Sequence, residues 1–184
     1  MLVSDLFMRR SAVISPCKLY RYTLSRVWDD GLPVLVVCML NPSTADDQVE
    51  DPTLLALIHF AKLWGYGGLL IVNLYAYRSS SPAEMMKAGS AVGPDNGLHM
   101  TNALVTANMR GGGRLLAAWG NGGNVDFGYG DRAEWFRARA RLNMLELICL
   151  GTTMGGSPKH PMARGKHRTP RDQQPIVWAE APTA

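Results

Sequence analysis

The sequence predicts an α/β fold: a three-layer sandwich around a largely parallel four-stranded sheet, with one antiparallel strand added near the N-terminus. Four short apolar runs, long enough for buried strands and too short for helices, alternate with segments that begin with helix-capping residues. Each run also ends abruptly in small or polar residues. A chain of 184 residues fits one domain, for which we expect residues 15–178, with an N-terminal extension over 1–14 and a C-terminal tail over 179–184.

The first half of the chain contains two predicted strands and a helix. Residues 18–27 alternate apolar and polar side chains, which is typical of a half-exposed strand. Asp29-Asp30-Gly31 then forms a tight turn into a continuous apolar strand over residues 34–40. Asp51-Pro52 begins a helix as N-cap and first helical residue, and Gly65 ends it.

The second half repeats the alternation of strand and helix. Ser81 to Glu84 has the spacing of a capping box, and Asp131 is a second candidate N-cap. A segment rich in glycine, proline and basic residues follows the last strand, and a short apolar piece covers 176–178. The predicted elements are a strand over 69–75, a short helix from 81, a helix over 96–109, a strand over 114–119, a helix over 131–142 and a strand over 145–150.

The composition is that of an ordinary globular protein, with 47% apolar and 18% charged residues. A net charge of +4 permits a polyanionic partner and is weak support for one. Cys38 and Cys149 lie inside apolar runs and Cys17 is left over, which indicates reduced thiols in the cytoplasm. The first eleven residues lack the apolar core of a signal peptide, and no apolar run is long enough to span a membrane.

The polar ends of the four apolar strands form the candidate site. Because the carboxyl ends of parallel strands meet at one edge of a sheet, we expect these segments to lie close together. They are Asn41-Pro42-Ser43-Thr44, Asn73 with Tyr75 beyond it, Trp119-Gly120-Asn121, and the loop from Gly151 to Pro161 that contains His160.

These motifs, in this order, resemble those of the uracil-DNA glycosylase superfamily. Asn41-Pro42 matches the turn that positions the hydrolytic water, and Asn73 matches the asparagine that recognises the flipped base. Trp119-Gly120 matches a third strand end, and His160-Pro161 matches the motif that stabilises the departing base. The resemblance implies a uracil-DNA glycosylase-like fold and hydrolysis of the bond between a base and deoxyribose.

A second resemblance covers residues from about 15 to 178. The chain is identified as a member of a bacterial and phage family known as domain of unknown function 1643, whose name carries no activity. The matching segments are Tyr20-Arg21-Tyr22, Asn41 to Asp46, Asp51-Pro52-Thr53, Trp64-Gly65-Tyr66 and Pro158 to Pro161.

The chain departs from the uracil-specific pattern at two places. Ser43 stands where those enzymes have a bulky tyrosine, so we expect weak exclusion at the pyrimidine 5-position and room for a larger or 5-substituted base. Met162-Ala163-Arg164 replaces a loop whose leucine fills the vacated base stack. Either Met162 or Arg164 would have to fill that space, or the wedge is absent.

We predict three catalytic residues. Asn41 would orient water, although an amide does not accept a proton usefully. Asp46, with Asp47 as its alternative, would supply the missing carboxylate. His160 would stabilise the negative charge that develops on the departing base.

Two further sets of residues would bind the substrate. The residues predicted to contact the base, by hydrogen bonds or stacking, are Ser43, Asn73, Tyr75, Trp119 and Asn121, with Tyr77 as an alternative stacking residue. The residues predicted to contact DNA are Lys159, Met162, Arg164, Lys166 and Arg168.

Each of these residues also has a purely structural interpretation. Residues 41–44 could be only a turn and helix cap, and Asn73 a satisfied core amide. Asp51 is most simply a helix cap, and Asp46 is more simply a solvent-facing loop acid. We predict no metal, because His160 and His167 lack cysteine or carboxylate partners at ligand spacing, and we predict no cofactor.

Three functions remain open. The first is a DNA-acting N-glycosidase that flips a base, as in repair or modified-base processing. The second is a module that binds DNA or a modified base without catalysis. The third is a hydrolase of free nucleotides or nucleosides, which would turn over small substrates. We expect DNA as partner, no membrane and a monomer, although the sequence does not determine the oligomeric state.

Overall fold

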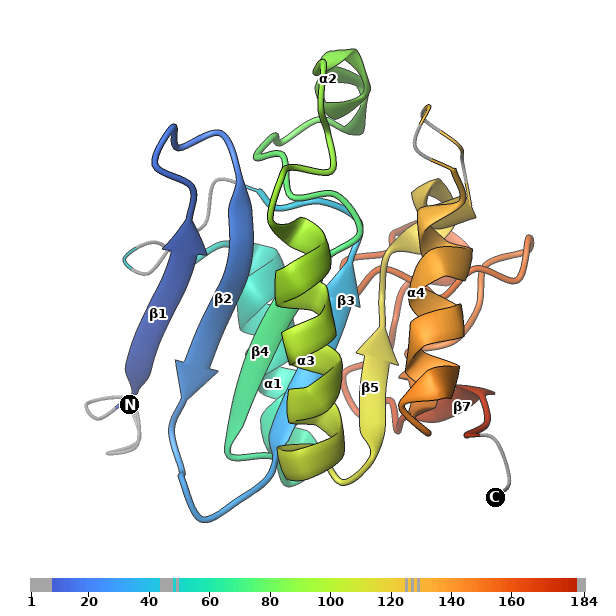
Figure 1. Ribbon diagram of the computed structural model, residues 1–184. Helices are drawn as coiled ribbons and strands as arrows, with labels where there is room; N and C mark the ends of the chain where they lie inside the picture. The colour runs from blue at the N-terminus through green and yellow to red at the C-terminus, as the bar shows by residue number, and fades with distance from the viewer. Residues whose placement is uncertain are drawn as a thin grey trace.

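The computed structural model describes residues 8–43, 48, 50–124, 126, 128 and 130–181. Its strands form a single seven-stranded sheet in the order β1-β2-β4-β3-β5-β6-β7 (Figure 1). The four central strands run parallel: β4 pairs with β3, β3 with β5, and β5 with β6. They are β3 (Val34–Met39), β4 (Gly68–Asn73), β5 (Arg114–Ala117) and β6 (Glu146–Cys149).

The central strands are the four apolar runs that the sequence analysis predicts. All six residues of β3 are buried, because helices cover both faces of this part of the sheet. A strand covered on both faces must be apolar throughout, which is why its sequence does not alternate. The predicted α/β class and the parallel centre are therefore confirmed.

The edges of the sheet were predicted incompletely. β2 (Arg21–Val27) is the expected antiparallel strand, but β1 (Arg9–Ile14) and β7 (Ile176–Ala179) extend the sheet beyond the five strands predicted. β1 is mostly exposed and β7 has four residues, so neither carries a clear hydrophobic period. The sheet consequently includes residues on both sides of the predicted domain, 15–178.

Four α-helices within the described ranges complete three layers. α1 (Pro52–Leu63) covers one face of the sheet, while α3 (Asn96–Arg110) and α4 (Arg132–Leu142) cover the other. Figure 1 shows α3 and α4 in front of the sheet and α1 behind it. The short helix α2 (Pro82–Lys87) lies beyond the carboxyl ends of the strands.

Helix caps were predicted correctly at α1 and α4 and incorrectly at α2. The Asp51 side chain accepts from the Leu54 amide at 2.7 Å, and Asp131 accepts from the Glu134 amide at 2.8 Å. Ser81, by contrast, makes no side-chain cap hydrogen bond. The Glu84 carboxylate accepts from the Ser79 hydroxyl at 2.9 Å instead, so the predicted capping box is not formed.

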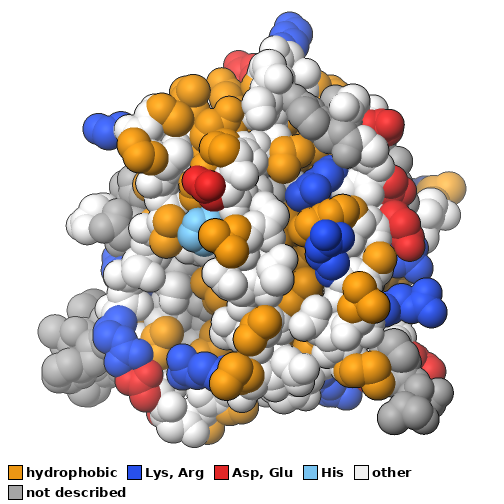
Figure 2. Space-filling view, viewed as in Figure 1, with side chains coloured by type: hydrophobic (Ala, Val, Ile, Leu, Met, Phe, Trp, Pro, Cys, Tyr) orange, Lys and Arg blue, Asp and Glu red, His pale blue; other side chains and the backbone are white. Residues whose placement is uncertain are grey.

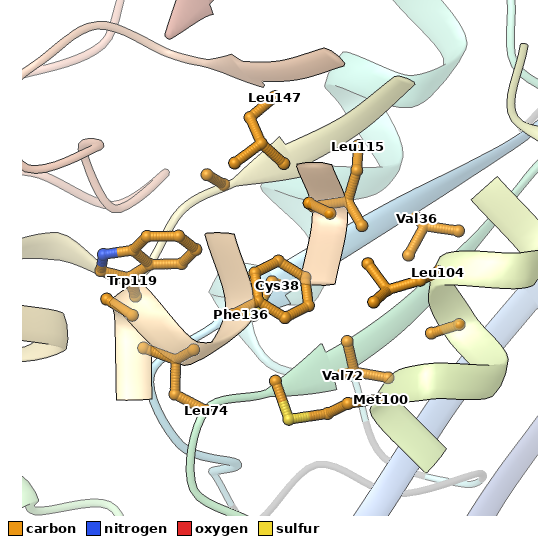
Figure 3. Close-up of a cluster of buried hydrophobic side chains, with 14 of the residues drawn as sticks. Val36, Cys38, Val72, Leu74, Met100, Leu104, Leu115, Trp119, Phe136 and Leu147 are labelled. Atoms are coloured by element: carbon orange, nitrogen blue, oxygen red, sulfur yellow. The ribbon is translucent and has the colours of Figure 1, made fainter. Parts of the chain in front are cut away.

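Two apolar layers flank the sheet. On one side, Val36 and Cys38 of β3 pack with side chains of α3 and α4, and Figure 3 shows Leu104 and Phe136 in this layer. On the other side, Leu35 and Val37 pack against α1. The alternation of side chains along β3 therefore divides the core into an α3/α4 layer and an α1 layer.

The surface over α3 and α4 carries a cationic region. Figure 2 shows this face, with Lys and Arg side chains gathered among apolar ones over α4. Trp135 lies between two guanidinium groups, that of Arg132 at 4.3 Å and that of Arg139 at 3.9 Å from the ring centre.

No helix in the part of the chain that the structure describes is long and apolar enough to cross a membrane.

The strand order places a crevice at the carboxyl end of β3. From β3 the chain passes through α1 to β4 on one side, then returns through α3 to β5 on the other side. Open α/β sheets bind ligands where the chain reverses direction in this way. This fold therefore predicts a ligand site at the end of β3, two residues before Asn41.

Candidate functional site

A small pocket of about 70 Å³ lies at the carboxyl ends of β3 and β4, on the face covered by α1. The structure brings together there four side chains that the sequence analysis proposed as site residues: Asn41, Ser43, Asn73 and His160. The apolar part of the lining comes from β2, β3, β4 and α1. The polar lining residues are Arg21, Asn41, Ser43, Asp51, Thr53, Asn73 and His160.

Asn73 is the last residue of β4 and lies opposite Met39 in the parallel pair. Asn73 is 1% exposed, yet among the described residues neither its Oδ1 nor its Nδ2 has a hydrogen-bond partner. A buried polar group left unpaired costs about 1–3 kcal/mol, so proteins rarely keep one without a reason. No described residue pairs with the Asn73 side chain as a satisfied core amide would require, and both ends of its amide lie at the pocket without a partner among the described residues.

Asn41 is oriented by backbone carbonyl groups. Its Nδ2 donates to the carbonyl oxygen of Ser79 at 2.8 Å and to that of Pro42 at 3.2 Å. The Ser79 amide donates in turn to the Pro42 carbonyl at 3.0 Å, which fastens the turn after β3 to the segment after β4. Because both amide hydrogens are used, Oδ1 is the polar atom that Asn41 can offer to the pocket, as a hydrogen-bond acceptor.

Asp51 supplies a carboxylate to the pocket. The Ser43 hydroxyl donates to its Oδ2, while its Oδ1 caps α1 through the Leu54 amide. The cap was predicted correctly from the sequence, whereas the place of the carboxylate in the pocket was not predicted, although Asp51-Pro52-Thr53 is one of the family motifs. Asp46 and Asp47, the predicted sources of the carboxylate, lie outside the described residues.

His160 is held at the pocket by its own loop. The Gly120 amide, just beyond β5, donates to the Pro158 carbonyl at 2.9 Å, and the Lys159 amide donates to the Gly151 carbonyl at 2.8 Å. The Met162 amide donates to Nδ1 of His160 at 3.0 Å. Since a backbone amide can only donate, the proton of the neutral ring is on Nε2, which is left as a donor.

Burial also affects the protonation of His160. Desolvation lowers the pKa of the ring below its ordinary value of 6.5, and the nearby charge of Asp51 acts in the opposite direction. The ring is therefore neutral at pH 7. A neutral imidazole with Nε2–H is a hydrogen-bond donor suited to an oxygen or nitrogen that gains negative charge.

Arg21 lines the pocket and was missed by the sequence analysis. It lies in β2 and is 4% exposed. A β-bulge pairs Val13 with Thr23 and Ile14 with Arg21, so that Tyr22 is an extra residue. The bulge shifts the side-chain alternation, and Arg21 comes to share a pocket with Leu24. Strict alternation would place these two residues on opposite faces, which is why the period-two pattern could not identify Arg21.

Tyr75 and Trp119, predicted to stack on a base, are not brought to the pocket. Both are buried in the α3/α4 layer, and Figure 3 shows Trp119 beside Leu74 and Phe136. The Trp119 ring packs edge-on against Phe136 and Trp178, at 6.0 and 5.3 Å between ring centres. β4 ends at Asn73, so its alternation does not extend to Tyr75, and the Trp119 side chain faces the same layer as Ala117. Neither ring has a free face for a base.

Two larger hollows adjoin the pocket. One of about 340 Å³, the loop hollow, includes Asn121, Lys159, His160 and Arg164 in its lining. Another of about 650 Å³, the α1 groove, lies between α1 and the segment 161–171. Its lining includes Met162, Arg164 and Arg168. Lys166 is exposed and lines neither hollow.

The side chains that could bind a metal ion are scattered among the described residues. Within the ranges that the structure describes, no three His, Cys, Asp or Glu side chains gather as a group that could hold a metal ion. The described residues that line the pocket offer two amides, two hydroxyls, a carboxylate, a guanidinium and an imidazole.

Comparison with known proteins relates this site to one family. A family described as "Protein of unknown function (DUF1643)" matches residues 21–162. This range contains all the residues that line the pocket, from Arg21 to His160. The search of curated proteins found no match, and the search of solved structures found none either.

Proposed function

The chain belongs to the DUF1643 family, whose description assigns no activity, and we propose from the site itself that the protein hydrolyses the N-glycosidic bond of a nucleobase in DNA. The base would be flipped into the pocket between Asn41, Asn73 and His160. The four ordered motifs that resemble those of the uracil-DNA glycosylase superfamily support the same reaction and a fold of that kind.

The observation that carries the proposal is the unpaired amide of Asn73. It presents one acceptor and two donor hydrogens inside a buried pocket, without a partner among the described side chains. The edge of a pyrimidine offers complementary donors and acceptors. The space beside Ser43 would decide which 5-substituent is accepted.

His160 would act on the departing base. As the C1′–N bond breaks, its electron pair passes to the base, which becomes negatively charged. The Nε2–H of a neutral His160 would donate to an oxygen of that base, in a region where burial strengthens the hydrogen bond. Arg21, also at the pocket, adds positive charge that favours the same anion.

Asn41 and Asp51 would act on the water. Asn41 Oδ1 accepts one hydrogen bond from the water and so orients its oxygen toward C1′. The Asp51 carboxylate stabilises the positive charge on the sugar and accepts one proton of the water. The water oxygen forms the new bond to C1′ and keeps its other proton. The proton taken by Asp51 is released to solvent, which restores the carboxylate, and the base nitrogen takes up one proton from solvent. The products are a free base and an abasic sugar.

The direct test is cleavage of defined oligonucleotides. Single-stranded and duplex DNA carrying uracil, thymine or 5-hydroxymethyluracil would be incubated with the protein and then treated with alkali, which breaks the chain at abasic sites. We expect strand breaks with the parent protein and a loss of about 10²–10³-fold in rate for Asn73→Ala, the range seen when a single transition-state contact is removed. Asn102→Ala, which removes an exposed amide on α3, is the matched control.

One observation favours a second candidate, a module that binds a base without cleaving it. Both oxygens of Asp51 already accept hydrogen bonds, from Ser43 and from Leu54, which weakens this carboxylate as a proton acceptor. If binding is the function, Asn41→Ala leaves affinity intact while Asn73→Ala reduces it, and no oligonucleotide is cleaved. Release of base from free nucleosides under the same conditions would instead indicate a small-molecule hydrolase.

A further inference from the structure

The pocket and the two larger hollows are neighbours that share lining residues. His160 lines both the pocket and the loop hollow, while Ala163 and Arg164 line both the loop hollow and the α1 groove. A ligand held in the pocket could therefore extend in two directions without leaving the protein surface. Such a path suits a polymer better than a free nucleoside.

The α1 groove combines an apolar floor with a cationic rim. Leu55 and Met162 in its lining are 53% and 43% exposed, and the buried Phe60 also lines the groove. Arg164, Arg168 and Arg171 also line the groove, and no Asp or Glu among the described residues does so. Arginines along a groove bind the phosphates of a single strand, and the exposed apolar side chains between them offer surface against which an unpaired base can pack.

The wall of the groove is fixed in place by α1. The His59 ring bonds through Nε2 to the Arg171 carbonyl at 2.8 Å, and Trp64 Nε1 donates to the Gln173 carbonyl at 2.9 Å. These two contacts join a helix to a segment more than a hundred residues away in the chain. The groove is thus formed before any ligand binds, which lowers the entropic cost of binding.

The loop hollow is suited to a phosphate group. Lys159, Arg164 and His167 line it, again without an acidic residue in the described lining. Thr153 also lines it, and its buried hydroxyl has no hydrogen-bond partner in the part of the chain that the structure describes. Cationic donors and a free hydroxyl together match the oxygens of a phosphodiester.

We propose that these hollows bind a single strand of DNA, with a phosphate in the loop hollow, an unpaired neighbouring base in the α1 groove and the target base in the pocket. The identification of the target base rests on the function proposed above, whereas the strand-binding path does not. A duplex would be bound less well, because its stacked and paired bases cannot reach an apolar groove floor without further unpairing.

The test is fluorescence anisotropy with a labelled oligothymidylate, its duplex with oligodeoxyadenylate, and unlabelled thymidine monophosphate as competitor. We expect the single strand to bind at least about ten times more tightly than the duplex. Leu55→Ala and Met162→Ala should each weaken binding of the single strand by about 5- to 10-fold, because each removes part of the apolar surface that a base would cover. Leu98→Ala, at a 62% exposed leucine on α3 in the opposite layer, is the matched control and should bind as the parent does.

The salt dependence of binding tests the cationic rim of the groove. Arg168→Ala should weaken binding and reduce the slope of log K against log salt by about 0.7, the value for one lost contact to a single strand. Arg141→Ala, an exposed arginine on α4, should change neither. Equal affinity for duplex and single strand, or equal effects of Leu55→Ala and Leu98→Ala, would overturn the proposal.

The outcomes separate this proposal from the proposed activity. Selective single-strand binding without cleavage of any oligonucleotide would leave the strand path standing and contradict the hydrolase. Cleavage that is as fast on duplex as on single strands, and unaffected by Leu55→Ala or Met162→Ala, would support the hydrolase and contradict the strand path.

Discussion

At the scale of single residues, the candidate site contains side chains that use one polar atom in a hydrogen bond to the backbone and leave their other polar atom for the pocket. Asn41 uses both amide hydrogens on carbonyl oxygens, and His160 uses Nδ1 on a backbone amide. Asn73 makes neither kind of contact with the described residues. The first two are oriented by the fold, and the amide of the third is unpaired among the described residues.

Replacement of Asn73 by leucine tests whether this amide is kept for function. Leucine has a similar shape and no polar atoms, so Asn73→Leu should raise the free energy of unfolding by about 1–3 kcal/mol while it abolishes ligand binding. Urea denaturation measures the first effect and oligonucleotide binding the second. A variant that is less stable than the parent would indicate that Asn73 has structural partners after all.

The lowered pKa of His160 predicts how stability depends on pH. Because the folded ring has a pKa below 6.5, its contribution to stability is fully present above pH 6.5 and is lost as pH falls through the folded pKa. His160→Gln cannot titrate. The difference in unfolding free energy between parent and variant should be constant from about pH 8 to 6.5 and shift against the parent below it. Urea titrations at a series of pH values measure this, and a constant difference down to pH 5 would contradict the burial of the ring.

At the scale of elements, the ends of three helices organise the rim of the sheet. The N-terminus of α1 brings Asp51 to the pocket. The N-terminal residues of α3 and α4 hold the end of β4: Asn96 Nδ2 donates to the carbonyl oxygens of Asn73 and Leu74, both at 3.1 Å, and Arg132 Nε donates to that of Leu74 at 3.2 Å. The backbone that carries Asn73 is therefore fastened from the opposite layer.

Two substitutions at Asp51 separate its role as a cap from its role as a charge. Asparagine caps helices about as well as aspartate, so Asp51→Asn should change the unfolding free energy by less than about 1 kcal/mol. Asp51→Ala should lower it by about 0.5–2 kcal/mol. If the carboxylate accepts the proton of water, both variants lose activity by about 10²–10⁴-fold. Retained activity in Asp51→Asn would favour the binding module over the hydrolase.

Asn96 should act as a positioning residue. Asn96→Ala removes two hydrogen bonds to the end of β4, and we expect a loss of about 1–3 kcal/mol in stability and weaker ligand binding through displacement of Asn73. The control Asn102→Ala, on the exposed side of the same helix, should affect neither. If Asn96→Ala lowers stability and leaves ligand affinity at the parent value, Asn96 serves the fold alone.

At the scale of the whole molecule, the three cysteines report on the integrity of the sheet. Cys38 and Cys149 are buried in β3 and β6, and burial raises the pKa of both thiols. Cys17 is exposed, and the hydrogen bond with Ser15 lowers the pKa of its thiol. We expect one of the three thiols to react rapidly with a thiol reagent in the native protein and all three after unfolding. A second fast thiol would show that the edge of the sheet opens readily.

Local sequence patterns were sufficient for the central strands and for four of the residues that line the pocket. A strand covered on both faces must be apolar throughout, so each parallel strand was visible as an uninterrupted run, and the residue after it could be assigned to the rim. Asn41, Ser43, Asn73 and His160, which were predicted from the strand ends and the loop after the fourth strand, line one pocket. β1 and β7 were not, because an exposed edge strand does not need an apolar period.

Which side chains reach the pocket was decided only by packing between distant segments. The bulge opposite Ile14 turns Arg21 toward the pocket, and the cap of α1 brings Asp51 beside Ser43. The end of β4 turns Tyr75 into the core. Side-chain direction after a strand end or bulge depends on backbone geometry that residue types alone do not specify. The sequence pattern therefore predicts where the candidate site lies. The tertiary structure decides which side chains line it.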